Sequence, residues 1–212
     1  CRTILDIGAG RGADLQIARE CHRAAALHAI DVCEDRTRVL SGLGIAVHAL
    51  DIERDRLPFP DSSVDVVIAN QILEHVKEIF WVWHEVSRVL PVGGTFIIGV
   101  PNLAAFHNRV LISMGKHPTS LKNSSAHVRG FTKHDLLRFL ECCFPRGYRL
   151  RRFAGSNFYP FPPALARPLA ALLPNMAWGI FFCFEKTRDY HDEFIAFPAA
   201  HGLETNFFTG RR

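Results

Sequence analysis

Apolar residues in the first hundred positions fall into short continuous runs, each followed by a segment with a different spacing. Runs of four to seven residues rich in Val, Ile, Leu and Ala are typical of buried strands, whereas apolar residues three or four apart predict helices. The expected strands are 3–7, 27–30, 45–49, 64–69 and 95–100, and the expected helices are 13–21, 34–40 and 79–90. This alternation predicts a parallel sheet with helices on both faces.

The pattern changes after residue 101. A helix over 103–114 is followed by a polar loop over 115–130. The next helix begins after Thr132, a suitable N-cap with Asp135 three residues on, and runs to about residue 143. Strands are expected at 148–153 and 180–186. We predict an α/β fold with a Rossmann-like, doubly wound, seven-stranded sheet, mostly parallel with an antiparallel last strand.

We expect one domain over residues 1–188, with a cofactor-binding half (1–100) and an acceptor-side half (101–188). Residues 189–212 show no clear period and are interpreted as a C-terminal tail. Because the chain starts with Cys1 and almost at once with a strand, we expect that it lacks its natural N-terminus.

One apolar stretch, 164–184, approaches the length of a membrane span. Arg167, Pro168, Pro174 and Asn175 interrupt it. We therefore predict no transmembrane span but a core helix followed by a core strand. Peripheral contact with a membrane surface stays open.

The composition is that of an ordinary soluble globular protein, with 48% hydrophobic and 22% charged residues. The net charge of +4, interpreted as spread along the chain, does not favour nucleic-acid binding. The six cysteines form no C-x-x-C pair, which favours a reduced, cytoplasmic compartment over a disulfide framework or a zinc site.

The strongest chemical signal is the glycine-rich sequence DIGAGRG at 6–12, between a strand and a helix. Gly8, Gly10 and Gly12 allow a tight turn and a close ligand, and the following helix N-terminus attracts an anion. Asp6 could pair with an ammonium group, so the loop suits an amino-acid moiety better than a pyrophosphate. The spacing Gly8-x-Gly10-x-x-Ala13 also satisfies the permissive dinucleotide fingerprint, so the glycines alone leave both ligands open.

Two further acids follow predicted strands. Asp31 ends the second strand, where a carboxylate can accept hydrogen bonds from both ribose hydroxyls. Its alternative role is to cap the next helix. Asp51 follows the third strand and could accept from an adenine amino group, with Ile52 covering the ring; alternatively, Asp51 is a surface turn residue.

These motifs together resemble class I S-adenosylmethionine-dependent methyltransferases. The resemblance rests on ILDIGAGRG (4–12), the acid at 31, DIERDRLPFPDSSVDVVIANQILEHV (51–76) and HEVSRVLPVGGTFIIGVPN (84–102), in this order. It is nearest to the broad group that includes quinone-biosynthesis methyltransferases. The sequence VPNLAAFHNRVL (100–111) also resembles MetW-type proteins of methionine biosynthesis.

The resemblance implies that S-adenosyl-L-methionine is the cofactor. It places the glycine loop with Asp6 around the methionine part, Asp31 at the ribose, and Asp51 with Ile52 at the adenine. It places Asn70 and Gln71 near the sulfonium. In some quinone O-methyltransferases a Glu-x-x-Glu-His sequence binds a divalent metal. The first position here is Gln71, and because an amide is a poor substitute for a carboxylate ligand, we predict no metal.

Three residues are candidates for the acceptor side. His75 could be a general base, or a surface histidine with a structural hydrogen bond. His127 could take a proton and Arg129 could pair with an anionic acceptor, or both could belong to a solvated loop.

We expect a methyltransferase whose small-molecule or lipid-like acceptor is selected by residues 101–161. One alternative is a non-catalytic partner subunit that keeps the fold. The other is a dinucleotide-dependent oxidoreductase, which the lack of a Tyr-x-x-x-Lys pair disfavours.

Overall fold

The computed structural model, which describes residues 1–203 and 207–210, contains one seven-stranded sheet in the order β3-β2-β1-β4-β5-β7-β6. Strand β7 pairs antiparallel with both β5 and β6, and the other neighbouring strands are parallel. The predicted fold class is therefore confirmed. The strands are β1 (Thr3–Ile7), β2 (Ala26–Ile30), β3 (Ala46–His48), β4 (Val66–Asn70), β5 (Thr95–Pro101), β6 (Tyr148–Ser156) and β7 (Gly179–Lys186).

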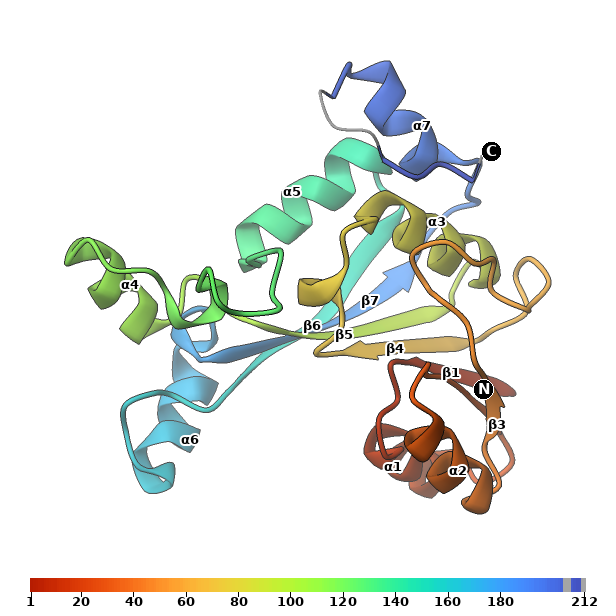
Figure 1. Cartoon of the computed structure of the whole chain (residues 1–212), viewed down its shortest axis with the longest axis horizontal. Coiled ribbons are helices and arrows are strands. Elements are labelled where there is room, and N and C mark those ends of the chain that lie inside the picture. Colours follow the sequence, from red (N-terminus) through yellow and green to blue (C-terminus); the bar gives the residue numbers. More distant parts are fainter. Residues whose placement is uncertain (204–206, 211–212) are drawn as a thin grey trace.

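Helices cover both faces of the sheet (Figure 1). One face carries α1 (Ala13–Cys21), α2 (Glu34–Gly42) and α6 (Pro163–Leu172). The other carries α3 (Ile79–Val89), α5 (Lys133–Cys143) and α7 (Glu193–Ala200). Helix α4 (Phe106–Ser113) projects beyond the sheet, and three 3₁₀ turns complete the fold: η1 (Leu73–His75), η2 (Thr119–Leu121) and η3 (Pro174–Met176). As predicted, the Thr132 hydroxyl caps α5 by accepting the Asp135 N–H, at 3.1 Å.

The main core lies between the sheet and the α3, α5 and α7 layer. Trp83 of α3 is fully buried and stacks on Phe194 of α7, with ring centroids 5.6 Å apart. The sequence pattern did not predict α7, because its apolar residues show no helical period. Helix α7 explains why every residue of α3 is buried, since it covers the side of α3 that faces away from the sheet.

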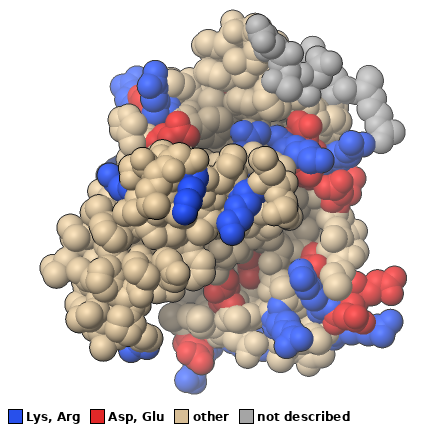
Figure 2. Space-filling model, turned by 60° about the vertical axis from the view of Figure 1, so that its left-hand side comes forward, with Lys and Arg blue, Asp and Glu red and all other residues tan. Residues whose placement is uncertain are grey.

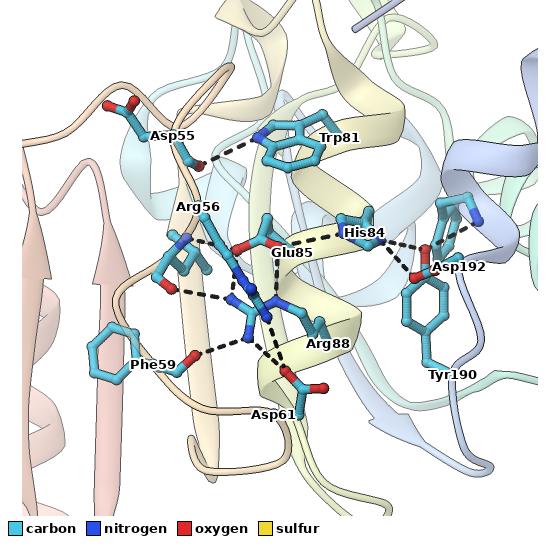
Figure 3. A network of polar contacts seen from close by, with 12 residues as sticks. Asp55, Arg56, Phe59, Asp61, Trp81, His84, Glu85, Arg88, Tyr190 and Asp192 are labelled. Atoms are coloured by element: carbon cyan, nitrogen blue, oxygen red, sulfur yellow. Dashed lines mark hydrogen bonds and ion pairs between the residues drawn. The ribbon is translucent and has the colours of Figure 1, made fainter. Parts of the chain in front are cut away.

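A buried ion-pair network attaches α3 to the segment before β4 (Figure 3). The Arg88 guanidinium forms two hydrogen bonds to the Glu85 carboxylate, at 2.6 and 2.8 Å, and one to Asp61, at 2.8 Å. On the same helix, His84 Nδ1 lies 2.9 Å from the Tyr190 hydroxyl, which precedes α7. The network thus fixes both the 51–64 segment and the C-terminal segment against α3.

For the apolar stretch 164–184, the predicted core strand is confirmed, but the predicted core helix is not. Its strand, β7, is a core strand with alternate residues buried. Its helix, α6, is not a core helix, because only Ala166 and Ala170 are buried, while Leu165 and Leu172 are 53% and 77% exposed. The small residues let α6 lie close to β6, so its larger apolar side chains point outward. Within the described residues, no helix is long and apolar enough to cross a membrane.

Candidate active site

The glycine loop joins β1 to α1 with three residues in the left-handed region, where glycine is favoured. Gly8, Gly10 and Gly12 have φ of +71°, +56° and +80°. A Cβ on Gly8 would lie 2.0 Å from Ile72 Cδ1, whereas a Cβ on Gly10 would meet nothing within 4 Å. Gly8 therefore lets Ile72 close over the loop, and Gly10 leaves open space in which a ligand would fit.

Gly12 has a different environment. A Cβ there would lie 2.8 Å from Leu40 Cδ2 on α2. Close packing between the start of α1 and α2 thus accounts for this glycine, and a direct contact of Gly12 with the cofactor stays a prediction.

The Asp6 carboxylate lies behind the loop and is only 2% exposed. Its Oδ2 atom is buried and has no hydrogen-bond partner among the described residues. Burial, together with the charges of Asp14 and Asp31, raises the pKa of Asp6 to about 8. A buried carboxylate without a partner, beside two other acids, suits a cationic ligand group and disfavours an anionic pyrophosphate.

Asp31 holds the glycine loop against the end of β2. One of its carboxylate oxygens accepts the Gly10 N–H at 3.1 Å, and the other accepts the Cys33 N–H at 2.9 Å. The capping alternative is wrong, because the N-cap of α2 is Cys33. A carboxylate oxygen has further lone pairs, so Asp31 can still accept from ribose hydroxyls.

A cavity of about 250 Å³ lies at the loop, and a larger one of about 420 Å³ lies between α1 and the strands β4 and β5, where Asn70 is the one predicted site residue in its lining. The smaller cavity joins residues from the ends of β1, β2 and β3, and among the predicted site residues it is lined by Gly8, Asp31, Asp51, Ile52 and His75. Asp51 is exposed there, and its carboxylate accepts the Glu53 N–H at 2.9 Å. Both predicted readings of Asp51 are therefore compatible: it forms a surface turn, and it faces this cavity.

Asn70 and Gln71 lie at the end of β4, beside the glycine loop. The Asn70 amide donates to Asp14 at 3.0 Å, and its Oδ1 is buried without a partner among the described residues. Asp14 is the acidic neighbour that the sequence analysis missed. Gln71 has φ of +58°, a strained conformation for a residue other than glycine, and such strain is frequent at functional sites.

Beside the smaller cavity, Glu74, His75 and His127 lie together, with ligand atoms within 4.8 Å of one another. His75 Nδ1 lies 3.3 Å from the Ala126 carbonyl, and His127 Nδ1 lies 2.9 Å from the Ser120 carbonyl. Because a carbonyl only accepts, these bonds place the proton of each neutral ring on Nδ1 and leave a lone pair on Nε2. The sequence singled out both histidines but not their contact.

This cluster can do two kinds of chemistry. Its imidazole lone pairs can take a proton, or two imidazoles and a carboxylate can bind a divalent metal ion. Glu74 is 1% exposed, and burial raises its pKa, which favours the protonated, poorly ligating form. The absence of a metal requirement, inferred from Gln71, stays a prediction, since His127 adds a ligand that the motif does not contain.

Arg129 anchors the His127 loop. Its guanidinium donates to the carbonyls of Val76 and Lys77, at 3.2 and 2.8 Å, and burial lowers its pKa. The Arg129 and Val128 N–H groups both donate to the Glu74 carbonyl. These bonds give Arg129 a structural role, and its pairing with an anionic acceptor stays a prediction.

Comparison with known proteins identifies the family. A model described as "Methyltransferase domain" matches residues 5–98. A probable S-adenosylmethionine-dependent methyltransferase of Mycobacterium tuberculosis is 31% identical over 198 residues, covering 81% of this chain and 67% of the relative. The chain belongs to the S-adenosylmethionine-dependent methyltransferases. A second relative of this methyltransferase, from Mycolicibacterium smegmatis, is 36% identical over 85 residues, which are 40% of this chain but only 30% of that protein.

The fold of the methyltransferase also matches solved structures. A methyltransferase from Archaeoglobus fulgidus superposes with a TM-score of 0.62 at 17% identity, over 88% of this chain and 86% of that one. The methyl donor of the family, S-adenosylmethionine, carries an ammonium group, a carboxylate and a sulfonium. The unpartnered Asp6 carboxylate and the open space at Gly10 fit the first two of these groups.

Proposed function

We propose that this chain transfers the methyl group of S-adenosylmethionine to a small-molecule or lipid-like acceptor. The observation that carries the proposal is the buried Asp6 carboxylate, without a partner and flanked by Asp14 and Asp31. A donor with an ammonium group and a sulfonium meets this negative potential favourably. The pyrophosphate of a dinucleotide offers no cation to pair with Asp6 and would lie near the acids Asp14 and Asp31, which argues against an oxidoreductase.

When bound, S-adenosylmethionine supplies a methyl group on an already activated sulfonium. The protein therefore has to hold the donor and the acceptor nucleophile in line, since positioning alone can lower the barrier substantially. Asp6 and the glycine loop would hold the amino-acid end, Asp31 the ribose, and Asp51 with Ile52 the adenine. Asn70 and the strained Gln71 would then face the reacting carbon.

His75 is the residue we assign to proton transfer. It lines the smaller cavity together with Gly8, Asp31, Asp51 and Ile52, and among the described residues its Nε2 has no hydrogen-bond partner. His75 Nε2 would accept the proton that the acceptor nucleophile gives up on methylation, and the donor would leave as a neutral thioether. The Ala126 carbonyl, which accepts from His75 Nδ1 at 3.3 Å, and the His127 ring, which packs edge to face on His75 at 4.7 Å, would orient the His75 ring.

The acceptor wall would come from residues 101–161, because the ends of β1 to β4 are used by the cofactor. The resemblance of 100–111 to MetW-type proteins and of the cofactor half to quinone-biosynthesis methyltransferases is consistent with this proposal. It does not select one acceptor.

The test is incubation of the purified chain with S-adenosylmethionine, labelled in its methyl group, and a cell extract. We expect label in one acceptor fraction and about a hundredfold or greater loss with His75→Ala, the usual contribution of a general base. Cofactor affinity should stay nearly unchanged in that variant. Binding of the cofactor with no transfer to any fraction would contradict the proposal and favour a non-catalytic partner subunit.

A further inference from the structure

A lobe at one end of the molecule has its own small core and an apolar outer surface. We define the lobe as α4 together with residues 157–178, which include α6 and η3. Inside it, Phe158, Ala166, Ala170 and Ala177 are buried, and Phe106 of α4 stacks on Phe158 with ring centroids 6.0 Å apart. The lobe therefore holds its shape without help from its outward-facing side chains.

Those outward-facing side chains are unusually apolar. Of the fifteen large apolar residues that are exposed in the described part of the chain, nine belong to the lobe or directly follow α4. On an ordinary protein surface, exposed apolar residues are scattered singly, whereas here they are gathered in one region. The nine are Val110, Ile112, Met114, Tyr159, Phe161, Leu165, Leu172, Leu173 and Trp178.

The charges around the lobe are of one sign. Residues 101–184 contain eleven Lys and Arg but only two Asp and Glu, and both acids, Asp135 and Glu141, lie on α5 outside the lobe. The positive charge is thus not spread evenly along the chain, as the sequence analysis interpreted it, but concentrated in segment 101–184. In and beside the lobe it is carried by Arg109 of α4, Arg167 of α6, and Lys116 and Lys122, which follow α4. Figure 2 turns this end forward and shows a broad tan area crossed by blue side chains, with red side chains only at its edges.

A groove of about 500 Å³ runs between α4 and the Tyr159–Pro160 loop. Phe106, Val110 and Leu111 give it an apolar wall, while Lys116 and Lys122 stand at its polar side. An apolar wall beside two ammonium groups suits a molecule with a hydrocarbon part and an anionic head.

We propose that this lobe docks the protein on an anionic lipid surface. Exposed Leu, Ile, Tyr and Trp side chains among Lys and Arg are the pattern of proteins that lie at a membrane interface. The basic residues complement the negative headgroups, and the lack of acids in the lobe removes the repulsion that would oppose binding. A protein partner would not need this single-sign charge.

The position of the lobe relative to the active site is also suitable. Segment 116–122 leads from the groove to η2, and the Ser120 carbonyl of η2 holds the His127 ring at 2.9 Å. A lipid lodged in the groove would therefore approach the end of the sheet where the cofactor residues meet. The docking itself does not depend on the proposed methyl transfer.

The experiment is co-sedimentation of the full chain with phosphatidylcholine vesicles, with and without phosphatidylglycerol. We expect binding to the anionic vesicles that weakens as salt is raised. Replacing both Leu165 and Leu172 by Ser should weaken it about tenfold or more, because each buried leucine side chain contributes substantially. Lys116→Ala with Lys122→Ala should weaken it by a similar factor.

The matched control is Val39→Ser, which removes an apolar side chain of comparable exposure from α2, far from the lobe in sequence. It should bind vesicles like the unchanged chain. No sedimentation with anionic vesicles, equal binding to neutral vesicles, or equal loss in the control would overturn the proposal. So would a stable dimer, measured by analytical ultracentrifugation, that the double leucine variant dissociates, because the lobe would then be a contact between copies.

Discussion

Asp6 is the residue on which the identification of the ligand depends. Its carboxylate is buried, lacks a partner and lies near two other acids. Ionisation is therefore unfavourable, as its pKa of about 8 indicates. A protein that keeps such a group at the edge of a ligand loop gives up stability for binding. The natural compensation is a ligand cation that pairs with the carboxylate.

Cofactor binding should therefore release a proton. Below about pH 8 the free protein holds Asp6 largely protonated, and a ligand ammonium favours the ionised form, so affinity should rise from about pH 6 to 8 and then level off. Calorimetry in buffers of different ionisation enthalpy would detect the proton. Apparent enthalpies that do not depend on the buffer would contradict this assignment.

The raised pKa of Asp6 also affects the stability of the free protein. The folded-state pKa lies above the ordinary value of 3.8, so the folded form binds more protons, and stability should fall as the pH rises from about 4 to 8. Asp6→Asn should remove this part of the decline in thermal unfolding. It should also weaken cofactor binding about tenfold to a hundredfold, because a charged hydrogen bond is lost.

Chelation tests the Glu74, His75 and His127 cluster. We expect methyl transfer to continue in EDTA, because Gln71 replaces a carboxylate ligand and burial favours the protonated form of Glu74. Loss of turnover in EDTA that Mg²⁺ or Zn²⁺ restores would show instead that the cluster binds a metal.

At the scale of elements, the strands could be predicted from the sequence more fully than the helices and the faces that the helices bury. Buried runs such as 66–70 identify strands by composition alone, and the Thr132 cap fixes the start of α5. Helix α7 was missed because it is apolar around its circumference, so no periodicity marks it as a helix. Helix α6 lies where the apolar stretch predicted a helix, but its burial was predicted wrongly, because its exposed side also carries large apolar residues such as Leu165 and Leu172. Their positions depend on which surfaces the rest of the fold leaves uncovered.

The Arg88 network is the element-scale feature whose removal should matter most for stability. Arg88→Ala would leave the Glu85 carboxylate buried without its partner, and we expect a loss of about 3–5 kcal/mol in the free energy of unfolding. Denaturant unfolding would measure it. The double variant Arg88→Met with Glu85→Leu should recover most of the loss, since no buried charge is then left unpaired. An unfolding free energy unchanged by Arg88→Ala would contradict the account.

At the scale of the whole molecule, the site could be predicted only in part from the sequence. The ends of β1, β2 and β4 meet because parallel neighbours share one edge of the sheet, so the meeting of Asp6 and Asp31 followed from topology, whereas Asn70 was implied by the family resemblance. The meeting of His127 with His75 did not, because it depends on how the segment 115–130 folds back and is held by Arg129. Asp14 was missed since nothing in its spacing marks it as facing the loop.

The division of charge is also a property of the whole chain. Segment 101–184 is strongly basic, and the remainder is net acidic, with its acids including the three around the glycine loop. A net charge of +4 conceals this division. Because of this division, the acids that attract a cationic cofactor and the basic residues that attract an anionic surface lie in different parts of the molecule.

The measurement that tests the central claim most directly is calorimetric titration of the purified chain with S-adenosylmethionine, S-adenosylhomocysteine and NAD in parallel. We predict saturable binding of the first two at one site, with a proton released on binding, and no binding of NAD. Saturable binding of NAD without a response to S-adenosylmethionine would contradict the account.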